Sequence, residues 1–223
     1  MGRPIELQAA DGHRFSAWLA EPAGTPRGGL VVLQEIFGVN HHIRQVTGRF
    51  AAEGYLAIAP ALFDRARRGV ELPYDEIATG REVMMSLKRA GILLDMRAAI
   101  DAVRSAGRVG AIGYCWGGAL ADLAACECGV DAAVSYYGRH TATWLKLQPR
   151  CPVMYHFGRL DPYIPPETVA AIQAGRQQGT FFIYEEAGHG FNCDRRADFD
   201  AGSSQLAWTR TVAFLETNLG SEA

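Results

Sequence analysis

The stretch VGAIGYCWGG, residues 109–118, decides the fold of this chain. It is an apolar, strand-like run that ends in Gly113-x-Cys115-x-Gly117. This spacing is typical of a sharp strand–turn–helix connection that presents a nucleophile, here with sulfur in place of the usual hydroxyl. A side chain on so sharp a turn has a strained backbone, and its neighbours two residues away must lack a Cβ that would collide with it. Cys115 is therefore the candidate nucleophile.

A helix is expected directly behind the sulfur, because Ala119, Leu120, Leu123 and Ala124 recur at helical spacing. The partial positive charge at the amino end of that helix favours both a thiolate and an oxyanion. The alternative interpretation is a buried structural cysteine in a glycine-rich turn, since free cysteine is among the most buried residue types. This segment alone does not separate the two interpretations.

Composition places the 223 residues among ordinary globular proteins, with 48% hydrophobic and 21% charged residues. The length fits one substantial core, so we expect a single domain over residues 1–223. A net charge of −2 with interspersed signs provides no basic face and argues against nucleic-acid binding. The first residues lack the apolar core of a signal peptide, and no apolar run approaches the ~20 residues of a membrane helix. We therefore expect a cytoplasmic protein without a membrane partner.

The five cysteines are an odd number without the spacing of a disulfide framework, which predicts free thiols in a reducing compartment. Cys126 and Cys128 are separated by one residue, but no second Cys or His pair stands nearby to complete four metal ligands. These two thiols are therefore expected in the core or on a helix surface rather than around a metal.

Strand-like apolar runs alternate with helical patterns along the chain. The expected strands are a hairpin within 4–21 around an Asp-Gly turn, then 30–33, 55–60, 109–114, 132–138, 152–157 and 181–184. Six helices are expected: residues 40 to about 54, residues 81–88, a helix that includes 96–103, one directly after position 115, one that begins at 165, and one that includes 208–219. This alternation predicts an α/β fold with a mostly parallel central sheet, helices on both faces and a small amino-terminal antiparallel ribbon.

Two polar residues come directly after predicted strands in the second half of the chain. Asp161 follows the strand at 152–157, and His189 follows the strand at 181–184. Ligands of parallel sheets bind beyond the carboxyl ends of the strands, where both residues and Cys115 are expected. A thiol that attacks an acyl carbon needs a base, and the base needs an orienting partner. The order nucleophile, acid, histidine therefore predicts a triad, although an Asp-Pro pair is also a common turn opener and a histidine between glycines can be a loop residue.

Five motifs spread along the chain occur together: QEIFG at 34–38, GYCWGG at 113–118, YYG at 136–138, Gly158-x-x-Asp161 and EEAGH at 185–189. With them the chain resembles, over essentially its whole length, the dienelactone hydrolase (carboxymethylenebutenolidase) family of the α/β-hydrolase fold. Members of that family open the lactone ring of dienelactone to give maleylacetate through an acyl-enzyme.

The resemblance implies a role for each of four side chains. Cys115 is the nucleophile, His189 the base, and Asp161 the residue that orients the base. Glu35, shortly after the strand at 30–33, is a fourth functional group beside the sulfur, for which a salt bridge to a surface arginine is the alternative. The scheme requires no metal and no organic cofactor.

Two backbone N–H groups and three side chains complete the expected site. The N–H groups of Ile36 and Trp116 can face the developing oxyanion from two strand-end turns. The resemblance also implies two basic side chains that hold a substrate carboxylate. One is expected a few residues after His189, and the other near residues 77–84, before the second amphipathic helix. Arg195 and Arg81 are the candidates, with Tyr137 as a further substrate-binding residue, and a solvated helix face is the alternative for both arginines.

The leading functional hypothesis is a cysteine-dependent hydrolase that opens a lactone, such as dienelactone, or a related activated ester that carries a carboxylate. One alternative is a thioesterase or peptidase on the same scaffold. Another is a redox-sensing or ligand-binding protein in which Cys115 reacts without turnover, for which Asp161 and His189 in triad order would have no use. The expected partner is a small-molecule substrate, and the expected assembly is a monomer or a small homo-oligomer.

Overall fold

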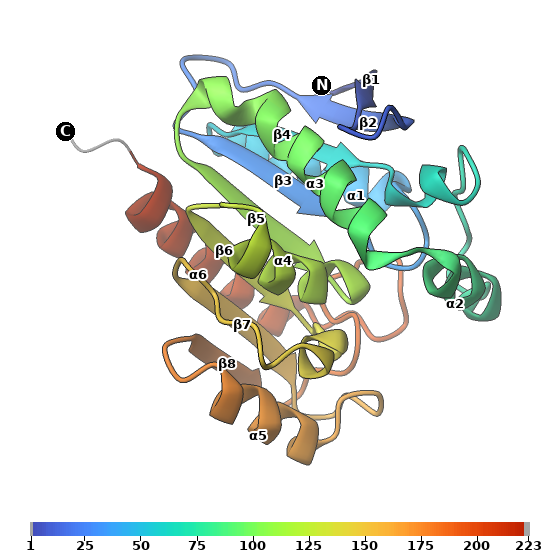
Figure 1. The fold of residues 1–223 in the computed structure, drawn as a ribbon. Coiled ribbons are helices and arrows are strands. Elements are labelled where there is room, and N and C mark those ends of the chain that lie inside the picture. Colours follow the sequence, from blue (N-terminus) through green and yellow to red (C-terminus); the bar gives the residue numbers. More distant parts are fainter. Residues whose placement is uncertain (1, 221–223) are drawn as a thin grey trace.

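The computed structural model describes residues 2–220, and within them eight strands form one sheet (Figure 1). The strands are β1 (Arg3–Gln8), β2 (Arg14–Ala20), β3 (Gly29–Leu33), β4 (Leu56–Pro60), β5 (Val109–Tyr114), β6 (Ala132–Tyr136), β7 (Val153–Gly158) and β8 (Thr180–Tyr184). Their order across the sheet is β1-β2-β4-β3-β5-β6-β7-β8. The pairs β1–β2 and β2–β4 are antiparallel, and the other neighbouring strands run parallel.

Helices cover both faces of this sheet (Figure 1). The helices are α1 (His41–Ala52), α2 (Ile77–Ser86), α3 (Arg89–Val103), α4 (Trp116–Glu127), α5 (Pro166–Gly175) and α6 (Ala201–Leu219), with short 3-10 turns η1 (Leu62–Arg65), η2 (Arg104–Ala106) and η3 (Arg139–Thr143). α3 and α4 pack against the central strands from one side, and α1 and α6 from the other. α2 lies beyond the carboxyl ends of the strands.

The central strands β3 and β5 are buried along their whole length, as the continuous apolar runs in both require. They pair in parallel, with Leu33 opposite Gly113. Because the two strands end side by side, the turn that contains Glu35 and Ile36 lies next to the turn that contains Cys115. The register of two buried strands therefore assembles the residues that were singled out in the sequence.

The predicted α/β architecture, with its mostly parallel sheet and amino-terminal antiparallel ribbon, is confirmed. The bounds of the helix predicted at 81–88 are wrong. α2 covers Ile77–Ser86, Leu87 has an extended backbone with a ψ of 133°, and α3 already begins at Arg89. Only Gly80 of α2 is fully buried, and Ile77, Val83 and Met84 are only partly buried against the core, so the apolar pattern is too weak to fix the bounds of the helix.

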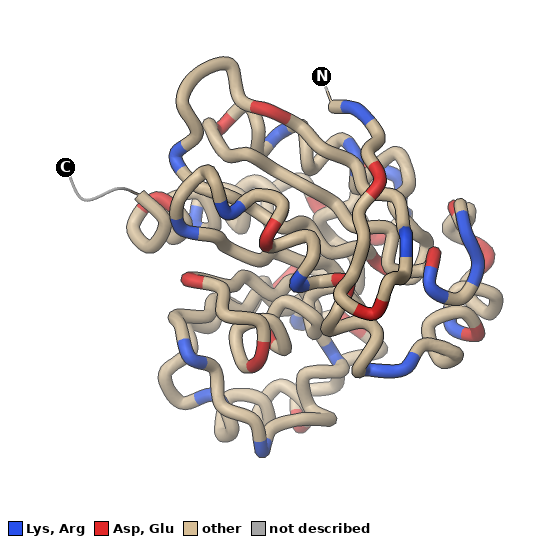
Figure 2. The backbone as a smooth tube through the Cα atoms, turned by 45° about the horizontal axis from the view of Figure 1, so that its top comes forward, with Lys and Arg blue, Asp and Glu red and all other residues tan. Residues whose placement is uncertain are grey.

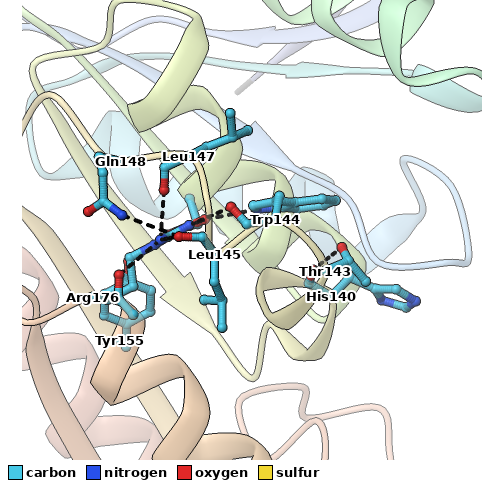
Figure 3. Close-up of polar contacts among 10 residues, drawn as sticks. His140, Thr143, Trp144, Leu145, Leu147, Gln148, Tyr155 and Arg176 are labelled. Atoms are coloured by element: carbon cyan, nitrogen blue, oxygen red, sulfur yellow. Dashed lines mark hydrogen bonds and ion pairs between the residues drawn. The ribbon is translucent and has the colours of Figure 1, made fainter.

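The segment after β6 is held in place by the buried side chain of Arg176 (Figure 3). Its guanidinium donates to the carbonyl oxygens of Trp144, Leu145 and Leu147, at 3.4, 3.3 and 2.9 Å. The same group pairs with the buried carboxylate of Asp122 on α4, with 2.8 Å from Nε to Oδ1 and 2.9 Å from Nη2 to Oδ2. The backbone that continues from η3 is thereby fixed against α4.

Charged residues are dispersed over the fold: in Figure 2 the blue Lys and Arg segments and the red Asp and Glu segments are interspersed along the tube. Several of them pair across elements, as Arg65 does with Asp95 and Asp11. In the part of the chain that the structure describes, no helix is both long enough and apolar enough to cross a membrane.

Candidate active site

Cys115 lies on the turn between β5 and α4. Its backbone has a φ of 54°, in the left-handed region that residues with a side chain rarely adopt. The turn leaves no room beside it: a Cβ on Gly113 would lie 1.9 Å from the carbonyl oxygen of Gly117, and a Cβ on Gly117 would lie 2.2 Å from that of Leu33. The two glycines are therefore needed for close approach of backbone to backbone.

The side chains of Cys115, His189 and Asp161 form one connected line at the carboxyl ends of β5, β8 and β7. His189 Nε2 lies 3.2 Å from Cys115 Sγ, and His189 Nδ1 lies 2.7 Å from Asp161 Oδ2. Asp161 Oδ1 accepts the backbone N–H groups of Tyr163 and Ile164 at 2.8 and 3.2 Å, which fixes the carboxylate. Asp161 and His189 are buried, whereas Cys115 is partly exposed. The geometry is that of a nucleophile, its base and the group that orients the base.

The surroundings of His189 favour its protonated form. Burial alone would lower the pKa of this imidazole, but the Cys115 sulfur and the Asp161 carboxylate outweigh burial and raise the pKa. A histidine with a raised pKa retains a proton that it takes from a reacting group. The site can therefore hold a protonated imidazole beside the sulfur.

Two backbone N–H groups are free at the same place. Ile36 follows β3 and Trp116 opens α4, and both residues line the cavity that contains Cys115. Neither N–H donates to a backbone or side-chain acceptor among residues 2–220. Unpaired donors at adjoining strand-end turns are suited to stabilise an oxyanion that forms next to the sulfur. Their roles remain predictions.

Glu35 is fully buried, and neither of its carboxylate oxygens has a hydrogen-bond partner among the described residues. Its nearest cation is Arg196, whose Nη1 lies 3.6 Å from Oε1 of Glu35. Burial lowers the pKa of Arg196, but Glu35, Tyr137 and Cys115 together outweigh burial and raise it. The salt bridge considered for Glu35 thus exists, but it is internal and lies close to the sulfur rather than at the surface.

A cavity of about 280 Å³ opens beside Cys115. The other residues that line it come from the turns after β3, β5, β6 and β7, from α2, and from the segment after β8: Ile36, Phe37, Ile77, Arg81, Met84, Met85, Trp116, Arg139, His140, Tyr163, His189 and Arg196. Arg81 reaches over the ring of Tyr163, with 5.8 Å from its guanidinium carbon to the ring centroid. The cavity therefore combines apolar and aromatic side chains with three guanidinium groups, those of Arg81, Arg139 and Arg196.

Two of the predicted substrate-binding residues do not line this cavity. Arg195 lies beside a separate cavity and exposes about half of its side chain. Tyr137 is fully buried, and its ring centroid lies 5.2 Å from that of His189, so its ring packs behind the base. Arg196, the second arginine of the pair, lines the cavity instead. Because the segment between β8 and α6 is irregular, no periodicity indicated which of the two points inward.

The sequence analysis also missed Arg139 and His140, which enter the cavity from η3. Burial, followed by the charges of Arg139 and Arg81, lowers the pKa of His140, so this imidazole is neutral at neutral pH. Both residues directly follow the YYG motif at the carboxyl end of a parallel strand. Because ligands bind at such strand ends, this position could have identified them as candidate site residues.

α2 approaches the site through a single glycine. A Cβ on Gly80 would lie 2.2 Å from the carbonyl oxygen of Ile36, so only glycine lets the helix come this close to the turn after β3. Met84 and Met85 of the same helix line the cavity, and Met85 is 78% exposed. The outer wall of the cavity is thus formed by a helix that has little buried surface of its own.

The chain is similar to known proteins over nearly its whole length. The model of the dienelactone hydrolase family matches residues 15–219. The carboxymethylenebutenolidase of Pseudomonas putida is 37% identical over 226 residues, covering 95% of this chain and 94% of the relative. Carboxymethylenebutenolidase 1 of Cupriavidus pinatubonensis is 30% identical, with 95% of both chains covered. A crystal structure of a dienelactone hydrolase-like protein from Klebsiella pneumoniae has a TM-score of 0.81 and 31% identity, covering 95% and 98% of the two chains.

These matches extend from the strands before the sulfur to the last helix, and they combine sequence identity with the same fold. They agree with the family resemblance inferred from the five sequence motifs. The chain belongs to the dienelactone hydrolase family and is a carboxylic ester hydrolase.

Proposed function

We propose that the chain hydrolyses a carboxylated lactone, with dienelactone as the first candidate, or a related activated ester, through an acyl-enzyme on Cys115. The observation that carries the proposal is the continuous contact from Cys115 through His189 to Asp161 beside a cavity of about 280 Å³. Relatives named carboxymethylenebutenolidase support lactone hydrolysis as the reaction class.

In the first half of the proposed reaction, the Cys115 thiolate attacks the carbonyl carbon and forms a C–S bond. The carbonyl oxygen becomes an oxyanion that the N–H groups of Ile36 and Trp116 stabilise. The bond to the leaving oxygen then breaks with its electron pair going to that oxygen, which takes the proton of the His189 imidazolium and leaves the imidazole neutral. In dienelactone the leaving group is an enolate stabilised by conjugation, so a thiolate is a strong enough nucleophile.

In the second half, a water molecule attacks the thioester carbonyl while neutral His189 takes its proton. The C–S bond breaks, the sulfur leaves with the electron pair, and the acid is released. Asp161 keeps the imidazole in one orientation through both halves. One water is consumed for each ester bond that is opened, and Cys115 is regenerated.

The charge of the cavity supports a substrate that carries a carboxylate. Arg81, Arg139 and Arg196 line the cavity, and no Asp or Glu of the described chain does so. Guanidinium groups bind carboxylates in a bidentate geometry. The apolar side chains of Ile77 and Met84 face the same space and suit the unsaturated carbon skeleton of a lactone.

Glu35 and Arg196 link substrate binding to activation of the sulfur. A substrate carboxylate that binds Arg196 competes with Glu35 for the same guanidinium. Glu35, released from that pair and without other hydrogen-bond partners, then becomes available to take up the Cys115 proton. The thiolate would thus form mainly when a carboxylated substrate is bound.

Trapping the acyl-enzyme tests the proposal. Wild-type protein is mixed rapidly with an activated aryl ester or dienelactone, quenched in acid and analysed by peptide mass spectrometry. We expect a burst of the leaving group and an acyl mass on the peptide that contains Cys115. Parallel thioester and peptide substrates test the alternative activities. Full turnover without any adduct on Cys115, or an adduct that never hydrolyses, would contradict the proposal.

A further inference from the structure

Three side chains that are potential metal ligands lie together outside the catalytic cavity. His42 is on the first turn of α1, and Cys193 and Asp194 are neighbours in the segment between β8 and α6. One ligand atom from each lies within 4.8 Å of the other two. None of the three lines the cavity beside Cys115.

His42 has no hydrogen-bond partner that would explain its burial. Only 4% of the residue is exposed, and its Nε2 is buried without a partner among the described residues. Its Nδ1 is 3.7 Å from Oδ1 of Asp194, which is too long for a hydrogen bond. A buried ring nitrogen that has no hydrogen-bond partner in the described chain is available to a metal ion. Neutral imidazole is the form that binds metals.

We propose that His42, Cys193 and Asp194 form a binding site for a divalent transition metal, with Zn²⁺ as the ion that fits best. Imidazole, thiolate and carboxylate are the three side-chain ligand types of zinc proteins. One thiolate and one carboxylate cancel the two charges of the ion, so the complex is neutral. A neutral complex suits a place where two of the three ligands are buried.

The required rearrangement is small. Tetrahedral coordination with bonds of about 2.0–2.3 Å places ligand atoms roughly 3.5 Å apart. The present separations of up to 4.8 Å close to that value if Asp194 turns inward, and about half of its side chain is exposed and free to do so. The Cys193 thiol now donates to the hydroxyl of Tyr74 at 3.1 Å, and on metal binding its proton leaves to solvent as the metal–sulfur bond forms.

A second cavity gives the ion an entry path and its fourth ligand. This cavity of about 510 Å³ is bordered by His42, Asn40, Glu71 and Arg195, and it is open to solvent. A water molecule from it would complete the coordination of the ion. The bound metal would tie the start of α1 to the segment that also carries His189 and Arg196.

Cobalt titration tests the proposal. Co²⁺ is added without oxygen to the Cys115→Ala variant, so that the catalytic sulfur cannot act as a ligand. We expect one ion per chain, visible d–d bands of tetrahedral intensity, a near-ultraviolet sulfur-to-cobalt band, and loss of these signals when Zn²⁺ is added. The absence of a sulfur-to-cobalt band at saturating Co²⁺ would overturn the proposal.

Two further substitutions locate the site. Cys193→Ser in the same background should abolish the sulfur-to-cobalt band, whereas Cys126→Ser, the matched control at another buried thiol, should retain it. Asp194→Asn changes an exposed side chain and leaves folding intact. It should weaken Zn²⁺ binding by about 10-fold or more, because loss of a residue that only orients a metal ligand already lowers metal affinity by about 10–100-fold. Zn²⁺ affinity is measured by competition with a chromophoric chelator. Unchanged affinity in Asp194→Asn, or a band that survives Cys193→Ser, would overturn the assignment.

Discussion

The guanidinium of Arg196 lies 3.6 Å from the buried carboxylate of Glu35, and it also forms part of the wall of the cavity beside Cys115. One side chain therefore contacts both the cavity beside Cys115 and the buried acid group of Glu35. Removing either partner leaves the other as a buried charge without its counterion.

Glu35→Gln removes the carboxylate while preserving the shape of the side chain. We expect hydrolysis to fall by about 10²-fold or more, because a positioned proton acceptor typically contributes 10²–10⁴-fold. Alkylation of the resting Cys115 should instead become faster, since a negative charge no longer opposes the thiolate. The measurement is the rate of alkylation against pH beside steady-state hydrolysis. If neither rate changes, Glu35 has only a structural role.

Arg196→Met should abolish the preference for carboxylated substrates. A hydrogen bond to a charged group contributes about 1.5–3 kcal/mol, so kcat/KM for a carboxylated ester should fall about 10–100-fold relative to a neutral ester. Arg195→Met is the matched control and should leave this ratio unchanged, because Arg195 lies outside the cavity. An equal change in both variants, or in neither, would refute the assignment to Arg196.

Cys115→Ala should abolish turnover and leave the fold intact, because it removes the attacking atom and creates only a small space. Cys115→Ser should be much weaker than the wild type, since a hydroxyl depends on a strong base whereas a thiol ionises near pH ~8.5. Circular dichroism controls for folding in both variants. Activity of Cys115→Ala at the wild-type level would eliminate the nucleophile assignment.

Much of the sheet and of the turn that carries Cys115 could be predicted from the sequence, because local sequence patterns determine both. The apolar runs of β3 and β5 and the glycines around Cys115 left few alternatives for the sheet and its central turn. Arg196 and the bounds of α2 were not predictable in this way. Arg196 lies in an irregular segment where neighbouring side chains follow no period. α2 buries only Gly80 completely, so its apolar pattern is too weak to mark its ends.

Buried His156 should make the fold sensitive to acid. Burial lowers its pKa to about 3, and the neutral ring contacts the hydroxyls of Tyr184 and Thr211 at 2.8 and 3.1 Å. The unfolded chain has the ordinary value near 6.5 and therefore binds an extra proton between the two pKa values. The stabilising contribution is complete above pH ~6.5 and is lost as the pH falls toward 3.

Lowering the pH from 7 to 5 should thus remove about 2 kcal/mol of unfolding free energy through His156. His156→Gln keeps a polar side chain that can bond both hydroxyls but cannot titrate. Urea unfolding at the two pH values should show a smaller pH dependence in His156→Gln than in the wild type. An identical pH dependence in both proteins would mean that other groups control acid stability.

The Arg176–Asp122 pair should be one of the costliest contacts to break. Arg176→Met leaves the Asp122 carboxylate buried without its cation, for which we expect a loss of about 3–5 kcal/mol in urea unfolding. The double variant with Asp122→Asn should recover part of this loss, because the unpaired charge is gone. Arg159→Met, at the exposed pair with Glu185, is the control and should change stability little. If Arg176→Met lowered the free energy of unfolding as little as Arg159→Met, the buried pair would be dispensable for stability.

The close approach of α2 at Gly80 also bears on how such an enzyme can acquire new substrates. One wall of the cavity, after β6, is anchored by buried charges, whereas another wall is α2, which approaches the turn after β3 closely at one glycine and presents two methionines to the cavity. Changes at Met84 or Met85 alter the shape offered to a substrate without disturbing the strands that hold the sulfur and its base. Selection for a different ester would therefore act first on α2, and the reaction chemistry would be inherited unchanged.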